Sequence, residues 1–270
     1  MLKKYTCLIA AVLIMSPMLM AQTLEEVVVT AQIREQSLQD VPISISAISG
    51  EDIADRSVDN LQSLSASVPN FMVVETQIDT SISIRGVRSG ANKGFEQSVP
   101  MNFDGISYPR SQLARTPLVD LERVEVLRGP QPTLFGKNAI GGVVNVTSAK
   151  PTEEFEGKFS TSHESEHGED QSLLVLSGAL SESVLGRLTV STREMDGWIT
   201  NTNMKRLEPQ RDETYIRGQL AWTSGDVDYN LKVETADFDS TGYAMEAIAP
   251  QDGYGLVFRG PIAVETDENW

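Results

Sequence analysis

The spacing of apolar and polar residues changes along the chain, and each change predicts a different kind of structure. A nearly continuous apolar run comes first, followed by a short stretch that contains three consecutive valines. The part that ends at Pro151 mixes short alternating segments with short helical ones between many turns. Beyond Pro151 the helical spacing disappears, and long alternating segments follow one another.

The first 21 residues have the layout of a secretory signal peptide. Lys3 and Lys4 give a basic start, Thr6 to Met20 is almost entirely apolar, and the small residue Ala21 precedes Gln22. A membrane anchor would need roughly 20 apolar residues to span a bilayer, which is longer than this run. We therefore expect residues 1–21 to be removed during export.

Residues 22–40 contain a segment that favours an extended backbone. Val27, Val28 and Val29 are followed by Thr30, and β-branched residues are enriched in strands. Such a segment can form the first strand of the domain that follows, or it can stay free and add as a strand to the sheet edge of a partner protein. The residues alone leave both interpretations open.

Residues 41–150 predict a compact α+β domain with short strands and many turns. Period-two alternation predicts the strands, and a cap at Ser49 and Asp52 predicts the start of a helix. Residues 87–98 are polar and predict an exposed loop. The expected elements are strands over 41–48, 71–74, 81–85, 99–104, 124–128 and 143–147, and short helices from 53, over 59–64 and over 118–123.

Residues 151–270 predict antiparallel strands that cross a membrane. The expected strands lie at about 155–164, 170–180, 184–194, 213–223 and 227–237, and each alternates between an apolar and a charged face. About ten residues with this dyad pattern are typical of a transmembrane β-barrel strand. A soluble antiparallel sheet with one wet face also alternates. The aromatic Trp222 near a strand end favours the barrel.

The connections between these strands alternate in length. Residues 181–183 and 224–226 predict tight turns, whereas residues 195–212 form a long polar loop and another begins at 238. Short turns on one side and long loops on the other are typical of outer-membrane barrels. We expect no strand at the end of the chain, and an incomplete barrel that marks a fragment or a truncated gene product.

Charge and composition exclude several classes of function. The formal net charge is −16, which disfavours nucleic-acid binding. Cys7 is the single cysteine and lies in the signal peptide, so neither a disulfide scaffold nor a cysteine zinc site is expected. His163 and His167 predict a solvated loop, not a metal site. The sequence lacks the common nucleotide-binding and hydrolase motifs, and we expect neither a cofactor nor an enzyme activity.

Several motifs together resemble the TonB-dependent outer-membrane receptors. The segment Glu25 to Ala31 is similar to the TonB box of that family. The longest match is the sequence DLERVEVLRGPQ at 120–131, followed by LFG at 134–136 and NAIGGVVNV at 138–146. Shorter matches are VPISI at 41–45, LQSL at 61–64 with Pro69 and Asn70, and ISIRG at 82–86. One departure is Pro132, where the family has a small residue.

The resemblance implies an α+β plug domain followed by the first strands of a transmembrane barrel. It assigns residues 1–21 to a signal peptide, 22–40 to the TonB-box segment and linker, 41–150 to the plug, and 151–270 to barrel strands. It implies that the TonB box, Glu25, Glu26, Val27, Val28, Val29 and Thr30, binds the energy-transducing protein TonB.

The same resemblance implies roles for two sets of plug residues. Arg85 and Arg128, each before a glycine, would pair with glutamates on the barrel wall, although a solvated strand-end arginine is the alternative. Ligand contact would come from outward plug loops, with Arg88, Lys93, Tyr108 and Arg110 as candidates to hold an anion such as a ferric chelate. Each of these residues could also be an ordinary solvated side chain.

The implied function is energised uptake of a large scarce ligand across the outer membrane. A ferric siderophore-type chelate is the expected ligand, and TonB and outer-membrane lipid are the expected partners. The alternative is a secreted acidic carbohydrate-binding module or hydrolase fragment, in which Trp198, Tyr215 and Trp222 would stack on sugar rings. A third interpretation is a truncated, plug-only interaction protein.

Overall fold

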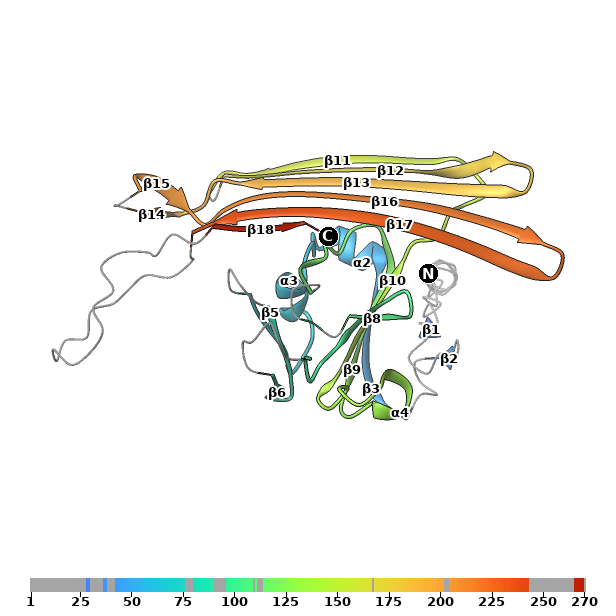
Figure 1. Ribbon diagram of the computed structural model, residues 1–270, viewed down its shortest axis with the longest axis horizontal. Coiled ribbons are helices and arrows are strands. Elements are labelled where there is room, and N and C mark those ends of the chain that lie inside the picture. The colour runs from blue at the N-terminus through green and yellow to red at the C-terminus, as the bar shows by residue number, and fades with distance from the viewer. Residues whose placement is uncertain are drawn as a thin grey trace, which may run out of the picture.

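The computed structural model describes residues 42–75, 80–89, 96–108, 110, 114–166, 168–201 and 204–242, and the backbone of three further strands at 28–29, 36–37 and 265–269. Two bodies are visible in Figure 1. A mixed α+β domain, called the plug below, comprises residues 42–150. A sheet of long strands, called the wall, lies across one side of it.

The centre of the plug is a five-stranded sheet with the order β3-β9-β10-β7-β8. Strands β10 and β7 run parallel, and the other neighbours are antiparallel. A smaller sheet, β4-β5-β6, packs with two short helices around the main apolar core. The elements are β3 (Ser44–Ser49), α2 (Gly50–Asp55), α3 (Leu61–Ser65), β4 (Phe71–Glu75), β5 (Thr80–Ile84), β6 (Val87–Arg88), β7 (Met101–Phe103), β8 (Ile106–Tyr108), β9 (Leu121–Arg128), α4 (Pro132–Phe135) and β10 (Gly142–Ser148).

Local sequence explains where the two helices near the wall begin. The Ser49 side chain accepts a hydrogen bond from the Asp52 backbone N–H at 3.1 Å and caps α2, as expected. Asn60 and Ser63 form a reciprocal capping box that starts α3. Gly50 is required at the first position of α2, because a Cβ there would lie 1.8 Å from the carbonyl oxygen of Leu121.

The expected helix over 118–123 is wrong, because strand β9 begins at Leu121. Strand β9 lies between β3 and β10, so its backbone pairs on both sides and Val124, Val126 and Leu127 are fully buried. A strand that is buried on both faces does not show clean alternation of apolar and polar residues. The first residues of β9 therefore resembled a short helix in the sequence. Pro132, the departure from the family pattern, occupies the first turn of α4, where its missing N–H costs no hydrogen bond.

The wall is a six-stranded antiparallel sheet with the order β11-β12-β13-β16-β17-β18. All five expected strands are present, and β16 and β17 are longer than the sequence predicted. The elements are β11 (Glu156–Glu164), β12 (Glu169–Ser181), β13 (Val184–Met195), β14 (Ile199–Asn201), β15 (Arg206–Glu208), β16 (Gln210–Ser224), β17 (Val227–Thr241) and β18 (Glu265–Asn269). Strand β18 corrects the expectation that the chain ends without a strand.

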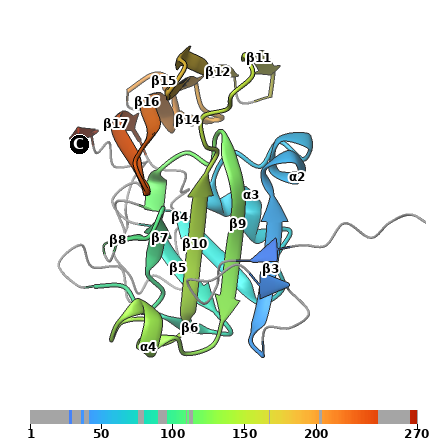
Figure 2. The same ribbon diagram turned by 90° about the vertical axis from the view of Figure 1, so that its right-hand side faces the viewer.

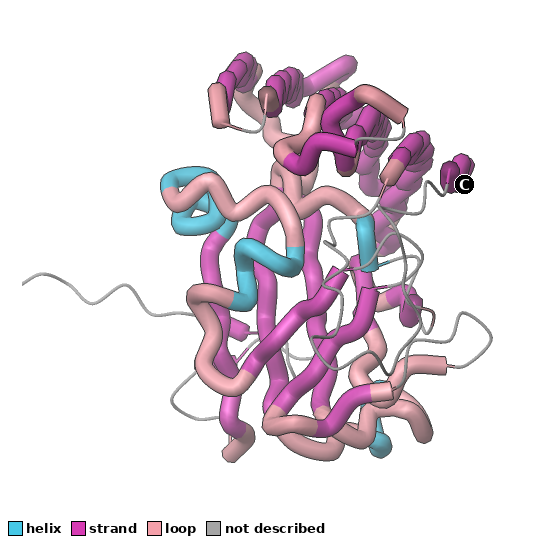
Figure 3. The backbone as a smooth tube through the Cα atoms, turned by 90° about the vertical axis from the view of Figure 1, so that its left-hand side faces the viewer, coloured by secondary structure: helices cyan, strands magenta, loops and turns pink. Residues whose placement is uncertain are grey.

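The two faces of the wall differ as their alternation predicts. Apolar side chains such as Phe159, Leu231 and Val233 are exposed on the face away from the plug. Polar side chains on the other face are covered by the plug, and Arg217 is completely buried. Figures 2 and 3 show the plug on one face of the wall from opposite sides. In Figure 2, β9 runs away from the wall and β10 runs back towards it. No helix in the described part of the chain is long and apolar enough to cross a membrane.

Candidate functional site: the contact between plug and wall

Asp120, which immediately precedes β9, is the centre of the contact between plug and wall. Its carboxylate accepts hydrogen bonds from Arg187 Nε at 2.9 Å and Nη2 at 2.5 Å, which is a bidentate pair. Thr189 Oγ1 donates at 2.5 Å to the same group. Arg217 Nη2 donates at 3.0 Å to the carboxylate and at 2.5 Å to the Asp120 carbonyl oxygen. One plug residue is therefore held by three side chains from β13 and β16.

This cluster is largely shielded from water. The exposed fraction of the side chain is 5% for Asp120, 9% for Arg187 and 0% for Arg217. Burial alone would raise the pKa of Asp120, but hydrogen bonds from Arg187 and Thr189 outweigh it, and the pKa lies below its ordinary value. The carboxylate is thus charged at neutral pH and pairs with both buried guanidinium groups, and Glu156 lies 3.5 Å from Arg187 as a second negative charge.

A second contact is made by the turn between β7 and β8. Lys232 Nζ on β17 donates to Asp104 Oδ2 at 2.8 Å and lies 4.5 Å from the centre of the Phe103 ring. Asp104 also accepts hydrogen bonds from the Ser148 backbone and hydroxyl. Burial raises the pKa of Asp104, and the hydrogen bonds from Lys232 and Ser148 lower it further than burial raises it.

Tyr108, at the end of β8, completes this second contact. Its hydroxyl donates to Glu234 Oε1 at 3.0 Å, while the hydroxyl of Tyr215 donates to Glu234 Oε2 at the same distance. Burial, followed by the charge of Glu234, raises the pKa of Tyr108 to about 12. The structure therefore places Tyr108 against the wall, whereas the sequence placed it in an outward loop.

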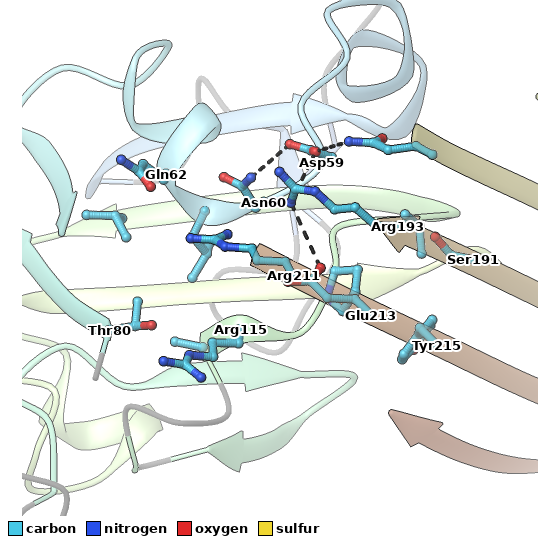
Figure 4. Close-up of a pocket in the computed structure, with 16 residues that line it drawn as sticks. Asp59, Asn60, Gln62, Thr80, Arg115, Ser191, Arg193, Arg211, Glu213 and Tyr215 are labelled. Carbon is cyan, nitrogen blue, oxygen red and sulfur yellow. Dashed lines mark hydrogen bonds and ion pairs between the residues drawn. The ribbon is translucent and has the colours of Figure 1, made fainter. Parts of the chain in front are cut away.

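A third contact joins the start of α3 to the wall. Asp59 accepts a hydrogen bond from Gln171 Nε2 at 2.7 Å and lies 3.5 Å from Arg193 Nη1. Arg193 also pairs with Glu169 at 2.8 Å. Figure 4 shows Arg193 between Asp59 and Glu213, with Arg115 farther along the contact between plug and wall. The cavity between these residues is about 40 Å³, which is large enough for one or two water molecules and too small for a chelate.

Charge is distributed in the same way in all three contacts. The plug supplies a carboxylate each time, from Asp59, Asp104 and Asp120, and the wall supplies the cation. Sequence reasoning placed the basic residues of β13, β16 and β17 on the charged face of the wall but did not identify their plug partners. These pairs are separated by 67 to 134 positions in the sequence and therefore leave no local pattern.

Arg85 and Arg128 lie at the other end of the plug. Strand β9 begins at the wall next to Asp120 and ends at Arg128, about 25 Å farther on at roughly 3.3 Å per residue. Arg128 Nη1 donates to the Pro69 carbonyl oxygen at 3.3 Å, and the Arg85 backbone N–H donates to Asn70. Neither arginine forms an ion pair with any residue that the structure describes, so their pairing with wall glutamates stays a prediction.

The remaining candidate residues are only partly placed. Arg88 in β6 and Arg110 are exposed, while Lys93 lies outside the described residues. Val28 and Val29 form strand β1 (Val28–Val29), which pairs with β2 (Gln36–Ser37) in a hairpin separate from the plug sheets. The other residues of the expected TonB box, Glu25, Glu26, Val27 and Thr30, lie outside the described residues.

His163 lies in strand β11 and not in the expected loop, and no metal-site geometry surrounds it among the described residues. His163 Nδ1 lies 2.8 Å from Asp170 Oδ1 in an exposed cross-strand pair, and His167 lies outside the described part. Within the residues that the structure describes, no three candidate ligands gather to hold a metal ion.

A small α+β domain seated on the polar face of a sheet, whose other face is apolar and exposed, defines the class of plugged membrane barrels. Comparison with known proteins agrees with this class. Residues 37–143 match the family model of the TonB-dependent receptor plug domain. Residues 37–143 are therefore a plug domain of the TonB-dependent receptor type.

Three relatives illustrate the match. The iron-regulated outer membrane virulence protein of Vibrio cholerae is 36% identical over 185 residues, which are 62% of this chain and 28% of that protein. The vitamin B12 transporter BtuB of Vibrio vulnificus is 34% identical over 139 residues, covering 49% and 22%. The ferric yersiniabactin uptake receptor FyuA from Yersinia pestis has a solved structure with a TM-score of 0.66 and 23% identity, covering 74% of this chain and 32% of that one, and it shows the fold.

The chain spans about a quarter of the length of the curated relatives that it matches. The structure correspondingly shows a plug with an open sheet of six strands, which is an incomplete barrel.

Proposed function

We propose that the protein is an outer-membrane receptor that captures a large, scarce ligand and imports it with energy supplied through TonB. The observation that carries this proposal is the plug itself, which lies on the polar face of the wall and is held there by three carboxylate–cation contacts. A domain in this position would occupy the lumen of a closed barrel, so transport would require it to move.

The proposed ligand is a ferric siderophore-type chelate. The names of the V. cholerae relative and of FyuA refer to iron, whereas BtuB is named for vitamin B12, so a plug domain of this type does not define the ligand. The exposed cations Arg88 and Arg110, together with Lys93, would favour an anionic chelate. Radiolabelled ferric chelates of the hydroxamate, catecholate and phenolate classes, offered to iron-starved cells, test this part of the proposal.

The proposed route of energy is the segment from Glu25 to Thr30, which would add as a strand to TonB. Strand β1 pairs over only two residues with β2 and is not part of the plug sheets, so exchanging that short pairing for a partner strand would not disturb the plug core. Export through cleavage of residues 1–21 and pairing of Arg85 and Arg128 with glutamates on other wall strands belong to the same proposal.

Deletion of residues 26–30 should abolish energised uptake of the chelate that the cells import and leave its binding at the cell surface unchanged. Deletion of residues 31–35 is the matched control, because it shortens the linker equally without removing the valines. Loss of surface binding together with uptake would contradict the assignment of this segment.

The alternative of a secreted carbohydrate-binding protein is less consistent with the structure. Tyr215 is 1% exposed and bonded to Glu234, whereas Trp198 lies beyond one end of β13 and Trp222 pairs with Val184 at its other end. The three rings therefore do not form one platform for sugars. Membrane fractionation separates the two functions, because a secreted module would be recovered in soluble form.

A further inference from the structure

We propose that a hollow on the membrane-facing side of the wall binds one acyl chain of a phospholipid whose headgroup carries an ammonium. This inference rests on the proposed location in the outer membrane and adds to it a defined lipid site. The hollow measures about 530 Å³ and lies on the apolar face of β12, β13, β16 and β17. Its apolar lining includes Leu176, Leu188, Leu220, Leu231 and Val233.

The hollow lies over three glycines, whose lack of a side chain leaves space above the strands. Gly178 is paired with Gly186 across β12 and β13, and Gly218 is paired with Leu188 across β13 and β16. Two of these glycines have a packing explanation, because a Cβ at Gly178 would lie 3.2 Å from Phe155 and a Cβ at Gly186 would lie 2.7 Å from Leu180.

Gly218 has no such explanation. A Cβ at this position would meet no atom within 4 Å, so nothing in the described chain requires a glycine there. In the middle of a strand, glycine weakens the sheet and often marks a place where a ligand approaches the backbone. The space above Gly218 is therefore a place where an external group can lie against the strand.

The position of the hollow along the strands identifies the group as an acyl chain. Trp222 and Tyr229 stack with their ring centres 5.3 Å apart, two residues beyond Leu220 and Leu231 towards the tight turn. Aromatic side chains of this kind mark the boundary between hydrocarbon and headgroups. The hollow thus begins just inside the hydrocarbon layer, in the leaflet next to the tight turns.

The charges at the turns select the headgroup. Glu182, Asp226 and Asp228 are exposed there, and neither residues 180–186 nor residues 220–229 contain a lysine or an arginine. Arg187 also borders the hollow, but its guanidinium is bound to Asp120 on the plug side of the wall. This rim repels an anionic headgroup and attracts an ammonium group. A phosphatidylethanolamine-type lipid therefore fits the site better than a phosphatidylglycerol-type lipid.

The test uses the full chain, reconstituted into vesicles with equal amounts of phosphatidylethanolamine and phosphatidylglycerol. Native mass spectrometry then counts the lipids that stay bound after transfer to detergent. The original protein should retain one phosphatidylethanolamine. Gly218→Leu should retain about tenfold less, which is the effect of losing the burial of roughly two methylene groups.

Thr192→Leu is the matched control, because it adds the same side chain on the same exposed face outside the hollow, and it should retain lipid as the original does. The double variant Glu182→Gln/Asp226→Asn should retain a lipid but lose the preference for the ammonium headgroup. Equal retention by Gly218→Leu and the original would overturn the inference. The inference would also be overturned if the original protein formed a dimer that Gly218→Leu abolishes, because the hollow would then be occupied by a second copy of the chain.

Membrane fractionation of the same variants separates this inference from the proposed function. Protein that is absent from the outer membrane would contradict the proposed function itself. Protein that is present in the outer membrane but retains no lipid would contradict only the lipid site.

Discussion

The two ends of strand β9 differ in how their charges are balanced. At the wall end, Asp120 is buried between Arg187 and Arg217, and every charge has a partner. At the far end, Arg128 and the nearby Arg85 have no ionic partner among the described residues. The difference teaches that the plug is matched to these wall strands at one end, whereas at the other end its two arginines find no ionic partner in the part of the chain that the structure describes.

The largest expected effect is that of Asp120→Ala. It would leave two arginines buried without their carboxylate, and breaking a buried ionic cluster in this way costs about 3–5 kcal/mol. Thermal unfolding and limited proteolysis of the plug in the membrane-inserted protein measure the loss. Asp55→Ala on the exposed side of α2 is the control. Equal behaviour of the two variants would refute the central role of Asp120.

A smaller effect is expected at the second contact. Lys232 and Asp104 have side chains that are 19% and 23% exposed, so their interaction is partly screened. A double-mutant cycle with Lys232→Met and Asp104→Asn should give a coupling of about 1 kcal/mol. Additive effects of the two substitutions would show that the pair contributes nothing to holding the plug.

Alkaline pH should weaken the same contact through Tyr108. The pKa of Tyr108 is raised from 10.0 to about 12, by burial and then by the charge of Glu234. A raised pKa means that the stabilisation is fully present below pH 10 and is lost as the pH rises towards 12. Tyr108→Phe should remove this part of the pH dependence of thermal unfolding. A slope that persists unchanged would assign it to another group.

Acid should affect the carboxylates only at low pH. The pKa values of Asp104 and Asp120 lie below their ordinary value of 3.8, so their stabilisation is present above that value and is lost as the pH falls through the lowered ones. The plug of the original protein should resist proteolysis equally at pH 5 and pH 7. A loss of protection between these values would contradict the charged state assigned to both groups.

The smallest loss of stability is expected for Arg128→Ala, if only the interactions of Arg128 with the described residues are counted. It removes one hydrogen bond of 3.3 Å to a backbone carbonyl, worth about 1 kcal/mol or less. If wall glutamates complete this end, the loss in the assembled receptor will instead approach that of Asp120→Ala. Comparing the two variants by the same proteolysis assay therefore sharpens the contrast between the ends of β9.

Much of the fold follows from local patterns in the sequence. Strict alternation predicted all five long wall strands and their faces, because side chains in a strand point to opposite sides in turn. The cap at Ser49 predicted the start of α2. The start of β9 was not predicted, because tertiary pairing on both sides, and not a local pattern, makes residues 121–123 extended.

The site was less predictable than the fold. Tyr108 was expected in an outward loop, but the short turn at Asp104 and Gly105 folds it back against β17. The contact of Asp120 with Arg187 joins residues 67 positions apart, and only the packed structure brings them together. The family resemblance identified the plug and its arginines but not the carboxylates that hold it.

A cysteine pair tests most directly whether the plug is seated on this wall. Cys7 is the only cysteine of the sequence and lies in the expected signal peptide, so Ala149→Cys and Gln219→Cys introduce the only thiols of residues 22–270. Gln219 on β16 donates to the Ala149 carbonyl oxygen of the plug at 3.0 Å, and this pair leaves Asp120 and its partners intact. In intact outer membranes this pair should form a disulfide and resist maleimide labelling, while Asp55→Cys with Gln219→Cys should stay labelled. Two free thiols in the first pair would contradict the account.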